Sequence, residues 1–186
     1  MEPDPLPRDA TAPSAASASV GTGLGLAGLA LCTAGTFLPP GSTAQLGAFT
    51  AGTAALTLLS TVVQPDAVFG RLQVVAMLGT LTGWLAIPDA WKAMFVGAIA
   101  VLALASLYRA GHRPPPLATV GILSLAAGFA TGLAPIYLTG GVAIALYAGR
   151  RYQHDRDPVS LLYAVLNVVF AVGAARGTWL WWTSAG

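Results

Sequence analysis

The chain alternates long apolar blocks with short breaks of polar residues, proline or glycine. No charged residue occurs between Asp9 and Asp66, and the main interruption is a Leu-Pro-Pro-Gly-Ser turn at 38–42. A helix needs about 20 mostly apolar residues to cross a hydrocarbon core about 30 Å thick. The blocks on either side of this turn have that length, so the pattern predicts two membrane-spanning helices joined by a tight turn.

The same pattern continues to the C-terminus and predicts seven spans. Residues 117–149 are too long for one crossing, because 33 residues of helix would extend about 50 Å. A Gly132-Leu-Ala-Pro135 break predicts two short helices here; the alternative is a broken or re-entrant segment whose backbone protein or water must cover. The expected spans are 17–38, 43–63, 69–87, 90–108, 117–133, 135–149 and 158–179.

Composition agrees with an all-α polytopic transmembrane helix bundle. Only 9% of the 186 residues are charged and the mean hydropathy is +0.70, whereas soluble domains have about 25% charged residues. Residues 17–186 are expected to form a single transmembrane domain. Residues 1–16, which are rich in proline, alanine and acid, predict a disordered tail.

The distribution of basic residues predicts the orientation, since Lys and Arg favour cytoplasmic loops. With the N-terminus inside and seven spans, the outer side receives only Lys92 and Arg176, whereas the inner side receives seven arginines. The C-terminus then lies outside the cytoplasmic membrane. The charged run 150–157 is interpreted as a hydrated inner loop. The inner arginines are Arg8, Arg71, Arg109, Arg113, Arg150, Arg151 and Arg156.

The tryptophans agree with this orientation, because amphipathic rings gather at membrane interfaces. All five fall at the predicted outer interface, where Arg176 can also extend its charge towards the headgroups. These residues are candidate interface anchors: Arg176, Trp84, Trp91, Trp179, Trp181 and Trp182.

A weak internal repeat accompanies the outer turns. Pro40, Pro88 and Pro135 are spaced 48 and 47 residues apart. Each unit is a two-helix hairpin, so successive copies share one orientation, as in parallel transporter repeats. The chain is therefore predicted to contain three similar hairpins and one additional helix.

The best copy of this unit, residues 71–108, carries Gly79, Gly83-Trp84-Leu85, Ile87-Pro88 and Gly97. In these features it resembles the hairpin unit of the SPW-repeat membrane proteins, and residues 23–61 form a poorer copy. The Ser-Pro-Trp tripeptide itself is absent. The resemblance implies a small multi-span protein of a family without an assigned activity.

Helices in lipid associate through small residues and polar contacts, because lipid tails are as apolar as leucine. The last helix places its small and polar residues on one stripe, which predicts that this stripe faces inward. An interhelical hydrogen bond is the expected role of the most deeply embedded polar group, Asn167. The candidate packing and polar residues are Asn167, Ser160, Gly79, Gly83, Gly128 and Gly132.

The residue inventory argues against most membrane enzymes and pumps. The only lysine, Lys92, is not inside the last span, as a retinal protein would require, and the expected spans contain no Asp, Glu or His. Proton pumps, haem ligation and intramembrane proteolysis depend on such groups. No catalytic residue, cofactor or metal site is predicted, and the arginines indicate topology rather than nucleic-acid binding.

Two functions from different classes are consistent with the sequence. The function that the sequence favours is a structural or accessory membrane subunit without catalytic chemistry, whose partners are lipids and other membrane subunits or further copies of the chain. The second is a passive carrier or channel for a small neutral solute.

Seven helices with Pro-broken spans resemble the sugar-transporting PQ-loop proteins, although no Pro-Gln dipeptide occurs. A shared aqueous surface would favour the carrier, and scattered groups bonded to their own helices would favour the subunit. The groups concerned are Thr50, Thr53, Thr57, Gln73, Thr80, Thr82, Thr131, Thr139 and Asn167.

Overall fold

The computed structural model describes residues 15–39 and 42–184, and within these ranges the chain is helical with no strand. The predicted break at Gly132 is present, since α5 ends at Thr131 and α6 begins at Ala134. The tail at 1–14 and Pro40 lie outside the described residues. The helices are α1 (Ala15–Phe37), α2 (Thr43–Leu58), α3 (Ala67–Thr82), α4 (Asp89–Arg109), α5 (Pro116–Thr131), α6 (Ala134–Asp155) and α7 (Pro158–Ser184).

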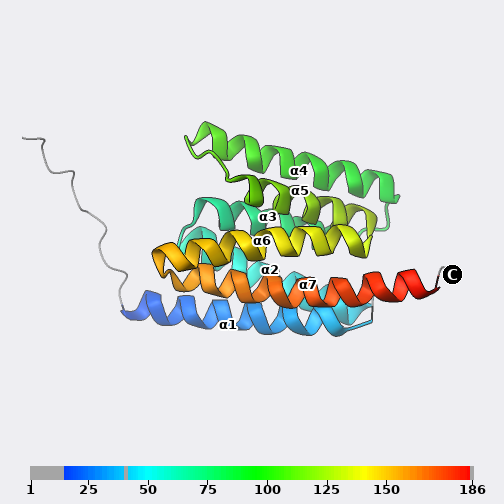
Figure 1. Ribbon diagram of the computed structural model, residues 1–186, viewed down its shortest axis with the longest axis horizontal. Helices are drawn as coiled ribbons and strands as arrows, with labels where there is room; N and C mark the ends of the chain where they lie inside the picture. Colours follow the sequence, from blue (N-terminus) through cyan, green and yellow to red (C-terminus); the bar gives the residue numbers. More distant parts are fainter. Residues whose placement is uncertain (1–14, 40–41, 185–186) are drawn as a thin grey trace, which may run out of the picture.

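All seven helices run roughly along the long axis of the molecule (Figure 1). Each helix packs against the next in sequence. The helix α2 is continued by a π-helical turn, η1 (Leu59–Val63), before α3 begins. Two further contacts close the bundle: α1 lies against α7, and α3 lies against α5. The start of α1 and the end of α7 lie at opposite ends of the bundle.

Four stretches of helix are long and apolar enough to cross a membrane: Ala18–Phe37, Thr43–Val63, Asp89–Arg109 and Pro158–Leu180. Two further apolar helices, Ala67–Thr82 and Pro116–Phe129, are shorter. Large apolar side chains remain exposed on the outside of the bundle, among them Leu102, Val168 and Val172. Such a surface suits a membrane protein, whose outer side chains contact lipid rather than water.

Two helix boundaries differ from the predicted ones. The helix α3 ends at Thr82 rather than near residue 87. The helix α6 continues to Asp155, so most of the charged run at 150–157 is helical rather than a loop. Arginine and glutamine are good helix formers, so loss of apolar character does not end a helix. The left-handed residue Arg156, with φ of 54°, ends it.

The α1–α2 hairpin is closed by two glycines that face each other. A Cβ at Gly52 would lie 2.6 Å from Cys32 Sγ and 3.0 Å from the Cys32 backbone nitrogen. A Cβ at Gly28 would lie 3.1 Å from the Gly52 carbonyl oxygen. The two backbones can approach this closely only because neither residue has a side chain.

The end of α2 is widened by η1, and its carbonyl groups are used by side chains. The Leu56 carbonyl accepts hydrogen bonds from Ser60 Oγ at 2.7 Å and from the hydroxyl of Tyr163 at 3.3 Å. Single π-helical turns often occur at functional sites in helices. Here the hydrogen bond of Tyr163 connects α7 to the end of α2, next to the turn.

Candidate solute cavity and its two ends

A small cavity of about 50 Å³ lies between α1, α2, α3, α5 and α7. Three polar side chains line it: Thr53, Gln73 and Asn167. All three are nearly fully buried, with 4–5% of their surface exposed. The apolar part of the lining is Cys32, Phe49, Leu72, Ala76, Leu125, Phe129, Leu166 and Phe170.

The polar groups that line the cavity leave oxygen acceptors without a hydrogen-bond donor. The Thr53 hydroxyl donates to the Phe49 carbonyl at 2.7 Å, and Asn167 Nδ2 donates to the Tyr163 carbonyl at 2.8 Å. The Thr53 lone pairs and Asn167 Oδ1 are then left to accept. Gln73 Oε1 is buried without a hydrogen-bond partner, the one such side-chain atom among the described residues.

An unpaired buried oxygen of this kind costs about 1–3 kcal/mol. The cavity beside Gln73 is where a partner with N–H or O–H groups would fit.

Aromatic rings separate this cavity from a larger one. Phe49, Phe129 and Phe170 line both cavities. Phe49 and Phe170 meet edge to face at a centroid distance of 6.2 Å, and Tyr137 packs edge to face against Phe129 and Phe170 at 5.4 and 5.5 Å. We call these four residues the aromatic partition.

The larger cavity, which we call the vestibule, has a volume of about 550 Å³. It lies between the ends of the helices, and the ion pair of Asp89 and Lys92 lines it, with Oδ1 and Nζ 3.2 Å apart. Thr80, Thr82 and Thr131 contribute hydroxyl groups. Thr80 Oγ1 lies 3.4 Å from Thr53 Oγ1, so a polar contact links the vestibule lining to the inner cavity.

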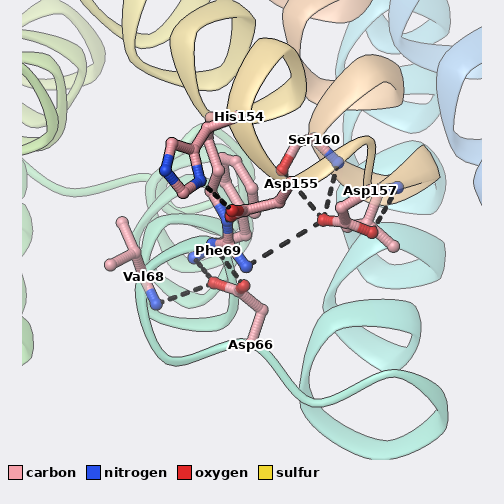
Figure 2. Close-up of polar contacts among 9 residues, drawn as sticks. Asp66, Val68, Phe69, His154, Asp155, Asp157 and Ser160 are labelled. Atoms are coloured by element: carbon pink, nitrogen blue, oxygen red, sulfur yellow. Dashed lines mark hydrogen bonds and ion pairs between the residues drawn. The ribbon is translucent and has the colours of Figure 1, made fainter.

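The opposite end of the bundle is held by ion pairs between α3, α6 and α7. Asp66 caps α3 by accepting from the backbone N–H of Val68 and Phe69 at 2.9 and 2.8 Å (Figure 2). Its other oxygen pairs with Arg151 of α6. Asp157 caps α7 and accepts from the Ser160 hydroxyl at 2.8 Å.

Arg151 connects these two capping carboxylates. It lies 3.9 Å from Asp157 Oδ2, and its guanidinium lies over the Phe69 ring at 5.3 Å. Burial by itself lowers the pKa of Arg151, but Asp66 and Tyr147 together outweigh this effect and raise the pKa above its ordinary value. Arg151 is therefore charged throughout the physiological range.

Aromatic rings fill the bundle next to these ion pairs. Phe69 stacks on Tyr163 with a centroid distance of 4.2 Å and packs against Tyr147 at 5.6 Å. Phe69 and Tyr163 are fully buried. We call Asp66, Phe69, Arg151, Asp157 and Tyr163 the closed-end cluster.

The last part of the chain, from Asp157 through α7, passes the closed-end cluster, the inner cavity, the aromatic partition and the vestibule in this order. Asp157 and Tyr163 belong to the closed-end cluster, Asn167 lines the cavity, Phe170 belongs to the aromatic partition, and Gly177 lines the vestibule. At 1.5 Å of rise per residue, Asn167 lies about 15 Å from Asp157, close to the middle of the apolar stretch Pro158–Leu180.

The structure places Asn167 and Ser160 in the interior, on the inner stripe expected for the last helix. They belong to different features, since Asn167 lines the cavity and Ser160 bonds to Asp157. The hydrogen bond of Asn167 Nδ2 differs from the interhelical one expected, because its acceptor, the Tyr163 carbonyl, lies four residues earlier in the same helix.

The four candidate packing glycines have different surroundings. A Cβ at Gly79 would lie 2.9 Å from the Phe129 ring, and one at Gly128 would lie 2.7 Å from the Tyr137 ring. These two glycines therefore make room for the aromatic partition. A Cβ at Gly83 would meet Leu46 at 2.6 Å, whereas Gly132 has open space around it and ends α5 with φ of +68°.

The candidate interface anchors lie on the surface. Arg176, Trp84, Trp91, Trp179 and Trp182 are exposed, and the Trp181 side chain lies outside the described residues. Trp84 Nε1 also donates to Thr50 Oγ1 at 3.0 Å, which joins the end of α3 to α2.

Of the nine threonine and amide positions considered for a solute path, six line the cavity or the vestibule. Thr50, Thr57 and Thr139 line neither.

Sequence reasoning missed the aromatic partition and the role of Arg151. Aromatic residues inside apolar spans carry no sequence signal that distinguishes a partition from ordinary packing, and Arg151 stood in a run interpreted as a hydrated loop.

Among the described residues, no group of three or more His, Cys, Asp or Glu is placed to hold a metal ion. Comparison of the chain with protein-family models, with curated protein sequences and with solved structures finds no match.

Proposed function

We propose that this chain is a carrier for a small neutral solute, built as a seven-span protein of the cytoplasmic membrane and lacking catalytic chemistry. The observation that carries the proposal is the cavity of Thr53, Gln73 and Asn167, lined by five helices and separated from the vestibule by aromatic rings. Binding sites near the bilayer midplane, between helices, are typical of secondary transporters.

The two ends of the bundle support a carrier rather than an open pore. One end has a vestibule of about 550 Å³. The other end holds the closed-end cluster, in which ion pairs and stacked rings join three helices, and a surface groove of about 550 Å³ lies beside Asp66. A cavity that the aromatic partition separates from the vestibule suits a carrier, in which parts of the bundle move about a fixed site to open it.

Solute flux into proteoliposomes tests the carrier. Vesicles containing the purified chain are expected to take up small neutral solutes such as urea and acetamide faster than empty vesicles, measured by stopped-flow light scattering. Phe49→Ala removes one ring of the aromatic partition and is expected to raise the flux severalfold. Phe95→Ala is the matched control, because Phe95 is half exposed on the surface of α4. Flux equal to that of empty vesicles for both the wild type and Phe49→Ala would refute the carrier.

A structural or accessory subunit is the second candidate, and a specific observation favours it. The hydroxyls of Thr53, Thr57, Thr80, Thr82, Thr131 and Thr139 all donate to carbonyls of their own helices. Such bonds satisfy a hydroxyl without any solute. Co-purification of a stoichiometric membrane partner from native membranes, together with absent flux, would favour this candidate.

The proposed topology has the N-terminus inside and the C-terminus outside, with three hairpins followed by one helix. The start of α1 and the end of α7 at opposite ends of the bundle support an odd number of crossings. The resemblance of residues 71–108 to SPW-repeat hairpins belongs to the same proposal.

A further inference from the structure

We infer that the cavity of Thr53, Gln73 and Asn167 is a binding site for a small uncharged hydrogen-bond donor of about four non-hydrogen atoms. This inference gives the proposed carrier its ligand chemistry and rests on that function for its physiological meaning. The evidence for binding itself comes from the volume, the charge and the hydrogen-bonding state of the cavity lining.

The hydrogen-bonding state defines which ligand groups are complementary. Gln73 Oε1 is buried without a partner, while the Thr53 hydroxyl proton and one Asn167 amide proton are used by backbone carbonyls. The lining therefore has three oxygens able to accept, from three different helices. A ligand with several N–H or O–H groups satisfies them, whereas a ligand with acceptors alone can pair only with the remaining amide N–H groups of Gln73 and Asn167 and leaves Gln73 Oε1 unpaired.

The charge of the lining excludes ions as well-matched ligands. No carboxylate, Lys, Arg or His lines the cavity. An ion would lose its hydration without a countercharge, which makes its burial far more costly than that of a neutral polar molecule. The side chains that complete the lining are three phenylalanines and small or aliphatic groups, which suit the flat faces of a small amide or urea.

The volume limits the size of the ligand. A water molecule needs about 10–15 Å³ of such volume, so a cavity of about 50 Å³ has room for roughly three to five non-hydrogen atoms. Urea, acetamide and acetone form a series of planar molecules with four non-hydrogen atoms each. They differ in donors, with four, two and no N–H groups respectively, and so separate hydrogen bonding from shape.

The side-chain amides of the chain provide a direct readout of binding. The sequence has four glutamines (Gln45, Gln64, Gln73 and Gln153) and a single asparagine, Asn167. NMR spectra of the full chain in nanodiscs, labelled with ¹⁵N at these amides, thus contain five side-chain signals, of which two report on the cavity. Gln73→Met assigns the Gln73 signal by its loss.

Titration with urea is expected to shift the Gln73 and Asn167 signals in a saturable way. The signals of Gln64 and Gln153, which do not line the cavity, are expected to show no saturable shift. Acetamide is expected to bind more weakly than urea, and acetone, which leaves Gln73 Oε1 unpaired, is expected to bind most weakly of the three. Equal responses to urea and acetone, or no saturable response to urea, would overturn the inference.

Two matched variants test whether Thr53 contributes an acceptor. Thr53→Val and Thr57→Val remove equivalent buried hydroxyls, each of which donates to a carbonyl four residues earlier at 2.7 Å. Only Thr53 lines the cavity. Loss of one neutral hydrogen bond is expected to raise the half-saturating urea concentration about two- to tenfold for Thr53→Val and to leave it unchanged for Thr57→Val. Equal values for the two variants would contradict the assignment of Thr53.

The experiments can refute the binding site and the carrier function independently of each other. Saturable urea shifts without solute flux would retain the site and refute transport. Flux of neutral solutes without any response of Gln73 and Asn167 to urea would retain transport and refute this site.

Discussion

At the scale of single residues, small side chains decide how closely the helices approach and where the rings can lie. Gly28 and Gly52 bring the backbones of α1 and α2 together, whereas Gly79 and Gly128 leave space for rings of the aromatic partition. In a membrane, where burial of apolar surface does not drive helices together, close packing of this kind supplies much of the association energy.

Gly52→Ala is expected to destabilise the protein by about 1–3 kcal/mol, since the added methyl group meets backbone atoms that cannot rotate away. Gly47→Ala, on the same helix with no atom within 4 Å of the added Cβ, is expected to be neutral or slightly stabilising because alanine favours the helix. Thermal unfolding in detergent measures both. An equal loss of stability in the two variants would contradict the α1–α2 contact.

At the scale of elements, the helix ends carry most of the charge. Asp66 and Asp157 each cap a helix and each lie close to Arg151, so one guanidinium ties the start of α3, the end of α6 and the start of α7. The Arg151 side chain is 28% exposed, so solvent weakens these pairs compared with fully buried ones.

Arg151→Gln is expected to lower the free energy of unfolding by about 1–2 kcal/mol, or roughly 2–8 °C in melting temperature. The reason is that Asp66, whose side chain is only 10% exposed, loses its countercharge. Arg150→Gln, at the exposed neighbouring position, is the control and is expected to have little effect. Equal melting temperatures for the two variants would contradict the conclusion that Arg151 joins three helices.

At the scale of the whole molecule, the vestibule and the closed-end cluster lie at opposite ends of the bundle. The distribution of arginines predicts that the vestibule faces outward. The loop before α4 would then lie outside and the loop before α5 inside, although both connect neighbouring helices.

Single cysteines test this topology in a Cys32→Ser background, since Cys32 is the only natural cysteine. Asp89→Cys is expected to react with a membrane-impermeant maleimide on intact cells. Arg113→Cys is expected to react only after the cells are opened. Labelling of both positions on intact cells would refute the alternating arrangement of the spans.

Much of the fold could be predicted from the sequence. The apolar blocks and the Gly132–Pro135 break indicated seven helices because helix length and proline act locally. Helix ends were less predictable: α6 continues through charged residues to Asp155, where sequence alone predicted a loop. Of the candidate site, Asn167 and its inward stripe could be found from residue spacing, and Gln73 appeared among nine possible polar positions.

The sequence by itself determined the helix count, and it predicted lipid as the surrounding medium and a direction for each crossing, since these depend on hydropathy, proline and the distribution of arginine. Only the tertiary structure decided which polar groups meet. Thr53, Gln73 and Asn167 come from three helices, and their common cavity depends on how each helix is rotated about its axis. Hydropathy does not report that rotation here, because lipid-facing and buried positions are both apolar.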